Sequence, residues 1–135
     1  MAGYSGTPLA KKLGIKPAMI MYVAHPPEGY FDWIAPLPEE LTVKEKLAGQ
    51  LDFIHLFVKS VSTLQKEFPR TKKYLQQNGM VWISWPKKSS GVKTDLDENV
   101  IRRIGLAEGL VDVKVCAVNE IWSGLKFVIR VKDRR

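Results

Sequence analysis

The chain has 135 residues, 45% of them hydrophobic, and carries 21 Lys and Arg against 14 Asp and Glu. This length suits one folded domain, and the apolar content excludes a disordered chain. The single cysteine, Cys116, cannot form an internal disulfide, and no apolar run approaches the roughly eighteen residues that cross a bilayer. The N-terminal residues lack the apolar stretch of a signal peptide. We therefore expect one cytoplasmic domain over residues 1–135, with residues 1–6 and 133–135 flexible, and no membrane partner.

The net charge of +7 is spread along the chain. Basic pairs recur, and a cluster of Lys132, Arg134 and Arg135 lies at the C-terminus, but no run of five basic residues forms a nucleic-acid-binding arm. Solvated surface is the simplest interpretation of most of these charges. A basic surface that binds protein or nucleic acid is the alternative, centred on the terminal cluster.

The first half of the chain predicts a helix and two buried strands. Thr7 and Pro8 can begin a short helix that ends at Gly14. AMIMYVAH (18–25) and LDFIHLFV (51–58) are continuous apolar runs, which are typical of strands buried on both sides of a sheet. Prolines and glycines interrupt the residues between these runs, so we expect loop with short helical pieces there.

A helix and a third strand follow. Ser60 and Ser62 can cap this helix, which bends at Pro69 and ends at Asn78–Gly79. The run MVWISW, residues 80–85, predicts the strand.

The last third predicts one more helix and a hairpin. Thr94 or Asp95 can cap the helix, Gly109 ends it, and its apolar positions share one face: Leu96, Val100, Ile101, Ile104 and Ala107. Residues 111–118 and 125–131 both alternate, and the short connection from Asn119 to Gly124 can join only antiparallel neighbours.

This order of elements predicts an α/β fold. Alternating buried strands and helices indicate a three-layer, Rossmann-like mixed sheet of about five strands, mostly parallel and finished by a C-terminal antiparallel hairpin. Ligands of such sheets bind outside the carboxyl ends of the strands.

Three segments resemble class I S-adenosylmethionine-dependent methyltransferases: LAKKLGIKPAMIMYVAH, LDFIHLFVKS and NGMVWISWPK. The resemblance implies a sheet in which 125–131 is inserted between 80–85 and 111–118. It also implies a glycine-rich cofactor turn after the first strand, where this chain instead has AHPPEGY. Pro26 and Pro27 remove backbone donors from that turn. We therefore expect no cofactor and no complete catalytic motif, with a degenerate methyltransferase as one alternative.

A second resemblance spans nearly the whole chain. LAKKLGIKP, VWISWPK and GLVDVKVCAVNEIWSGLKFVIR are similar to an uncharacterised family of small bacterial proteins, and the segment KVCAVNEIWSGLKFVIR is the most specific. The resemblance implies no reaction, cofactor or partner.

The loop after the third strand has the inventory of an anion site. It supplies an indole, two ammonium groups and two hydroxyls, from Trp85, Lys87, Lys88, Ser89 and Ser90. Lysine charges attract a phosphate or carboxylate, and hydroxyls complete its hydrogen-bonding shell. An ordinary solvated loop is the alternative interpretation.

Two further residues belong to the same predicted edge. His25 closes the first strand, and Trp122 lies in the hairpin connection, where it could form a stacking wall with Trp85 for a planar ligand. Capping of the core is the alternative role of Trp122. His55, near Asp52, is expected to be a hydrogen-bonded core histidine.

The sequence as a whole predicts that the domain binds a small anionic or nucleotide-like ligand at the carboxyl edge of its sheet. The ligand would contact Trp85, Lys87, Lys88, Ser89, Ser90, Trp122 and His25. No metal site is expected, because the histidines and the single cysteine lack metal-ligand spacing. We expect Cys116 to be a buried, inert thiol.

Overall fold

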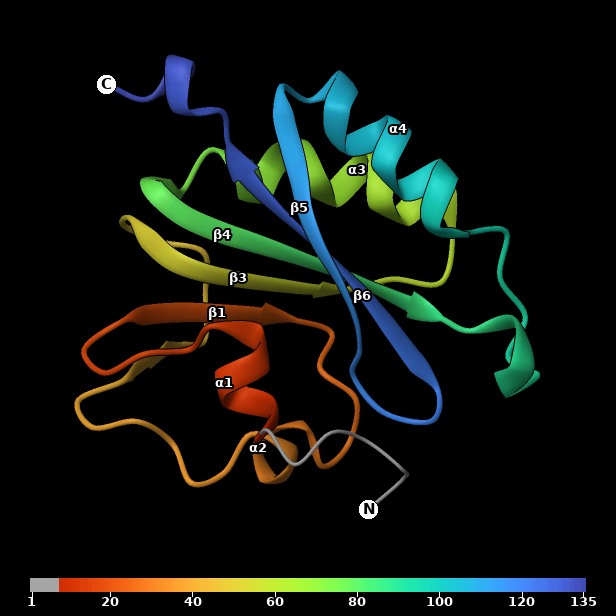
Figure 1. Ribbon diagram of the computed structural model, residues 1–135, viewed down its shortest axis with the longest axis horizontal. Helices are drawn as coiled ribbons and strands as arrows, with labels where there is room; N and C mark the ends of the chain where they lie inside the picture. The colour runs from red at the N-terminus through yellow and green to blue at the C-terminus, as the bar shows by residue number, and fades with distance from the viewer. Residues whose placement is uncertain (1–7) are drawn as a thin grey trace.

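The computed structural model describes residues 8–135, and in this part of the chain six strands form one sheet (Figure 1). Their order is β2-β1-β3-β4-β6-β5. The parallel strands are β1 (Ile20–Ala24), β2 (Thr42–Lys44), β3 (Leu51–Phe57) and β4 (Leu75–Pro86). β6 (Trp122–Ile129) pairs antiparallel with both β4 and β5 (Leu110–Ala117). The predicted Rossmann-like mixed sheet and its strand order are confirmed, with the short edge strand β2 in addition.

Helices cover both sides of the sheet (Figure 1). α1 (Leu9–Leu13) and α2 (Tyr30–Trp33) pack on one side, and α3 (Val61–Lys72) and α4 (Glu98–Ala107) pack on the other. Short 3₁₀ turns, η1 (Lys88–Ser90) and η2 (Val131–Asp133), follow β4 and β6. No helix between residues 8 and 135 has the length and apolar character to cross a bilayer.

The hydrophobic core is divided into two layers by the sheet. Ile54 and Leu56 of β3 pack in the layer under α3 and α4, whereas Phe53 and Phe57 pack in the layer under α1 and α2. All four side chains are almost fully buried. β3 therefore has no polar face, which explains its continuous apolar run.

The boundary between α3 and β4 differs from the prediction. α3 ends at Lys72, and β4 begins at Leu75, so Asn78–Gly79 lies inside a strand and does not end the helix. The reason is the close approach of β4 to β3. A Cβ atom at Gly79 would lie 3.0 Å from the carbonyl oxygens of Leu51 and Asp52. Glycine is therefore required at this position, because a side chain would be too close to the backbone of β3.

The beginning of α4 also differs. Asp97 is its N-cap, and its Oδ1 accepts a hydrogen bond from Val100 N (2.9 Å), whereas neither Thr94 nor Asp95 caps this helix. Ala107 is exposed, and Gly105 takes the buried position. The predicted end at Gly109 is confirmed by its positive φ of +87°.

Other helix ends agree with the sequence where they can be compared. Ser60 caps α3 by accepting a hydrogen bond from Thr63 N, and Gly14 ends α1 with φ of +86°. The predicted cap at Thr7 lies outside the described residues. The hairpin connection is shorter than predicted, because Trp122, Ser123 and Gly124 already belong to β6.

The packing of α4 on β6 predicts the effect of Gly105→Ala. The added Cβ would lie 2.1 Å from Cε1 of Phe127, so the overpacking cost outweighs the higher helix propensity of alanine. We expect the free energy of unfolding to fall by about 1–2 kcal/mol in urea titrations. Asn99→Ala, at an exposed position of the same helix, is the control. An unchanged or raised stability for Gly105→Ala would contradict this packing.

Candidate ligand-binding cleft

A cleft of about 460 Å³ opens at the carboxyl ends of β1 and β3. Its lining residues come from the turn after β1, the end of β3, the first turn of α3 and the start of β6: His25, Pro27, Phe57, Val58, Lys59, Thr63 and Trp122. The cleft therefore brings together four segments that are distant in the sequence.

The position of the cleft follows from the strand order. β2 lies on one side of β1 and β3 lies on the other, so the chain changes direction across the sheet between β1 and β3. The segments that leave these two strands diverge to opposite faces, and a crevice remains between them. Such topological switch points are where open α/β sheets bind their ligands.

Aromatic side chains form the floor of the cleft. Phe57 and Trp122 meet edge to face, with ring centroids 5.0 Å apart. Both residues are largely buried in the layer under α1 and α2. The cleft thus has an apolar base, beneath a rim that carries the polar groups of Lys59, Thr63 and His25.

The charge at the rim comes from Lys59, which is exposed. Its backbone is held in place by the loop before α4, because Thr94 Oγ1 donates a hydrogen bond to Lys59 O (2.6 Å). Asp95 Oδ1 in the same loop accepts a hydrogen bond from Val61 N (2.9 Å) at the start of α3. A carboxylate therefore already occupies part of the N-terminus of α3, and Lys59 provides the positive charge at the cleft.

His25 forms the opposite rim. Its backbone is in the left-handed region (φ +56°), and its Nε2 donates a hydrogen bond to Glu67 Oε2 of α3 (2.6 Å). This contact joins the end of β1 to α3 across the mouth of the cleft. The imidazole is 59% exposed and can reach a bound molecule.

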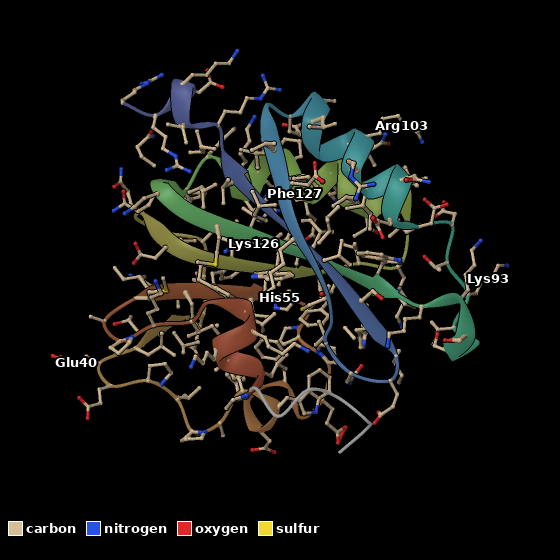
Figure 2. The ribbon with its side chains drawn as sticks, in the orientation of Figure 1. Glu40, His55, Lys93, Arg103, Lys126 and Phe127 are labelled. Carbon is tan, nitrogen blue, oxygen red and sulfur yellow. The ribbon has the colours of Figure 1, made fainter. Side chains whose placement is uncertain are left out.

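A buried hydrogen-bond chain around His55 lies beside the cleft. Figure 2 labels His55, in the middle of the sheet. Tyr30 Oη lies 2.9 Å from His55 Nδ1, and His55 Nε2 lies 2.7 Å from Ser84 Oγ. The ring stacks on Phe57, with centroids 4.2 Å apart. Burial lowers the pKa of His55 to about 3 and raises the pKa of Tyr30. The imidazole is therefore neutral, and His55 is the hydrogen-bonded core histidine that the sequence predicts.

The predicted site residues divide into two groups. His25 and Trp122 line the cleft, whereas the loop after β4 does not contribute to its lining. Lys88 and Ser89 of that loop are exposed. Ser90 Oγ donates a hydrogen bond to Lys87 O (2.6 Å) and accepts one from Val92 N, so this hydroxyl is used within the loop.

The predicted wall of two tryptophans is wrong. Trp85 packs under α3 and α4, whereas Trp122 packs under α1 and α2. In the register of β4 and β6, Trp122 pairs with Pro86, and neighbouring residues of a strand point to opposite faces. The sheet itself separates the two indoles.

Four lining residues are missed by the sequence analysis: Phe57, Val58, Lys59 and Thr63. Their position in the sequence could have indicated them, because they lie at or after the end of a buried strand, as the loop after β4 does. The sequence does not reveal which neighbouring strands diverge.

The other side chains that could carry chemistry, Asp52 and Cys116, are held within the structure and lie outside the lining of the cleft. Asp52 Oδ2 accepts a hydrogen bond from Ile20 N (2.9 Å). Cys116 is buried, as predicted, and burial raises the pKa of its thiol. Among residues 8–135, no group of three or more His, Cys, Asp or Glu side chains is placed to hold a metal ion.

A second cleft of about 310 Å³ lies near the C-terminus, at the amino end of β4. Lys72, Lys73 and Arg135 line it together with Glu108 and Asp133. Lys72 Nζ lies 3.1 Å from Glu108 Oε1. The carboxylates of Glu108 and Asp133 weaken the positive electrostatic field here. The predicted basic cluster at the C-terminus would need that field to bind a protein or nucleic acid.

The fold is one that resembles class I S-adenosylmethionine-dependent methyltransferases. Similar solved structures include a SAM-dependent methyltransferase from Aquifex aeolicus, with a TM-score of 0.60, 12% identity, and coverage of 88% of this chain and 86% of that chain. The DhpI–SAH complex has a TM-score of 0.63, 8% identity, and coverage of 89% and 81%. Magnesium protoporphyrin IX methyltransferase (ChlM) from Synechocystis PCC 6803 with bound SAH has a TM-score of 0.56, 10% identity, and coverage of 90% and 78%.

At sequence identities of 8–12%, these similarities establish a shared fold and no shared activity. No family model and no curated protein matches the chain. The predicted resemblance to the methyltransferase fold is confirmed, and the resemblance to an uncharacterised bacterial family stays a prediction.

The buried imidazole predicts a specific pH dependence of stability. Below the ordinary pKa of 6.5, the unfolded chain protonates His55, whereas the folded chain does so only near pH 3. The unfolded state then binds more protons, so the free energy of unfolding falls as the pH falls through this window, by up to about 1.4 kcal/mol per pH unit. Urea titrations between pH 7 and pH 4 should show a shallower slope for His55→Asn than for the wild type.

Tyr30→Phe is the matched control for this experiment, because it removes the hydrogen bond between Tyr30 and His55 and keeps the imidazole. This variant should lose stability at every pH and retain the wild-type slope. Equal slopes for the wild type and His55→Asn would show that His55 does not titrate in this window.

Proposed function

We propose that this domain binds a small anionic, nucleotide-like ligand in the cleft at the carboxyl ends of β1 and β3. The observation that carries the proposal is the coincidence of a topological switch point with a cleft that has an aromatic floor and a lysine at its rim. No catalytic constellation is required for this role.

The rim supports an anionic group on the ligand. The Lys59 ammonium is a point charge that attracts phosphate or carboxylate. Thr63 Oγ1 accepts a hydrogen bond from Ser60 Oγ (2.9 Å), so the Thr63 hydroxyl keeps its own proton to donate. The carboxylate of Glu67 is engaged by His25 at 2.6 Å, which reduces its repulsion of an anion.

The floor supports a planar, partly apolar group on the same ligand. Phe57 and Trp122 offer aromatic surface next to the charged rim. Two structures of similar fold contain SAH, a ligand that combines a nucleoside with charged groups. A nucleoside with an attached phosphate or carboxylate has the shape and polarity that such a cleft accepts.

A degenerate methyltransferase is the second candidate, and the fold supports it. The turn after β1 argues against it. Pro26 and Pro27 have no backbone N–H to offer, and Tyr30 N donates its hydrogen bond within the turn, to Pro27 O (3.1 Å). The turn therefore supplies few backbone donors for a cofactor.

Lys59→Gln tests where an anion binds. With ADP and adenosine as probes in calorimetry, we expect the wild type to bind ADP more tightly than adenosine. Lys59→Gln should remove about 1–3 kcal/mol of that preference, because one charge-assisted hydrogen bond is lost.

The double variant Lys87→Ala/Lys88→Ala is the comparison, because the sequence predicts that this loop binds the anion. We expect its stability to stay within about 0.5 kcal/mol of the wild type and its affinity for ADP to be unchanged. Loss of ADP binding in the double variant alone would move the site to the loop after β4. An absence of nucleotide binding in the wild type would overturn the proposal.

S-adenosylmethionine is expected to bind weakly, because the proline-containing turn cannot provide the amide contacts that glycines allow. Calorimetry should give a dissociation constant well above the low micromolar range, which corresponds to roughly −8 kcal/mol. A low-micromolar constant would support the methyltransferase interpretation.

A further inference from the structure

Lys114, Lys126 and Lys16 form a group of interacting charges on the α1 side of the sheet, and none of them lines either of the two clefts described above. Lys114 of β5 and Lys126 of β6 are direct cross-strand partners. Like charges in this arrangement repel each other, because their Cβ atoms are only about 5 Å apart. Lys126, labelled in Figure 2, lies over the middle of the sheet. Lys16, which follows α1, is the third charge of this cluster.

A β-bulge creates the cluster. Asp112 pairs with Phe127, and Lys114 pairs with the next residue, Lys126, so Val113 is the extra residue of β5. In a regular strand, Asp112 and Lys114 would point to the same face. Here Asp112 points to the α4 side and contacts Arg102, whereas Lys114 points to the α1 side. The bulge separates the lysine from the nearest carboxylate of its own strand.

Lys114 donates a hydrogen bond to the end of α1, whereas Lys126 does not. Lys114 Nζ donates a hydrogen bond to Lys12 O (3.0 Å), and Trp82 Nε1 donates one to Leu13 O (2.8 Å). The carbonyls one turn earlier accept hydrogen bonds from Gly14 N. The last turn of α1 therefore needs no further donor. In the part of the chain that the structure describes, the Lys126 ammonium has neither an acceptor nor an ion-pair partner.

The Lys126 ammonium is in the field of both other lysines. Partial burial lowers the pKa of Lys126, and the charges of Lys114 and Lys16 lower it further. The ammonium lies beside the backbone of Gly14, where a Cβ atom would be 3.9 Å away. A bound anion would replace this repulsion by attraction.

The charge of the molecule indicates a polymer as the partner. The three lysines come from three separate segments, after α1, in β5 and in β6, and none of them lines either of the two clefts described above. The chain as a whole carries a net charge of +7, which attracts a polyanion over a long distance. We propose that Lys16, Lys114 and Lys126 bind the phosphodiester backbone of a nucleic acid. The cluster contains no aromatic side chain to stack on bases, so the contact is independent of sequence.

The test compares two triple variants of equal charge. Lys16→Gln/Lys114→Gln/Lys126→Gln removes the cluster, and Lys66→Gln/Arg70→Gln/Arg103→Gln removes three exposed charges from α3 and α4, on the other side of the sheet. Fluorescence anisotropy with a labelled duplex DNA and a labelled duplex RNA is measured over a range of salt concentrations. Thermal unfolding shows that both variants fold.

The wild type and the α3/α4 variant should bind a duplex alike. The cluster variant should bind about tenfold more weakly or worse, with the slope of log affinity against log salt reduced by about 2 to 3 for duplex DNA. Equal losses in both triple variants would show a general charge effect and overturn the proposal. Binding of tripolyphosphate without binding of either duplex would also overturn it, in favour of a small ligand.

Single variants at Lys126 keep the test valid if the triple variant is unstable. Lys126→Gln retains the bond from Lys114 to Lys12 O and should weaken duplex binding without lowering the melting temperature. Lys126→Glu places a carboxylate between two lysines, so it should raise the melting temperature while reducing binding further. A fall in melting temperature for both variants, with duplex binding unchanged, would show a structural role and overturn the proposal.

Discussion

The neutral imidazole of His55 holds together the half of the molecule that contains the cleft. A polar ring in the middle of the central strand needs a partner at each nitrogen, because an unpaired buried group costs about 1–3 kcal/mol. Tyr30 of α2 supplies one partner and Ser84 of β4 supplies the other. Since α2 follows the turn after β1, the same contacts fix the position of that turn and with it one wall of the cleft. The bond from Trp82 to Leu13 O holds α1 on the sheet in a comparable way.

The strands that could be predicted are those whose burial leaves a pattern in the composition. β3 is apolar throughout because both of its faces are covered, and the second half of β4 is apolar for the same reason. β2 has only three residues, two of them exposed, and leaves no such pattern. The early start of β4 is equally hidden. It depends on how closely Gly79 approaches the backbone of β3, which is a tertiary contact that no local sequence expresses.

The candidate site was predictable to the level of the sheet edge and no further. His25 and Trp122 follow from the rule that ligands lie at the carboxyl ends of strands. Lys59 becomes a rim residue only because β2 lies beyond β1, and β2 is the strand that the sequence does not reveal. The separation of Trp85 from Trp122 depends on a shift of one residue in the register between β4 and β6.

The loop before α4 has a further consequence for the rim of the cleft. Its Thr94 and Asp95 hold Lys59 and Val61 at the start of α3, although these partners are 35 and 34 residues apart in the chain. The Val61 amide is therefore protected from hydrogen exchange only while the loop is docked. Opening of the loop breaks both hydrogen bonds at once, so the docked loop supports the shape of the rim at Lys59.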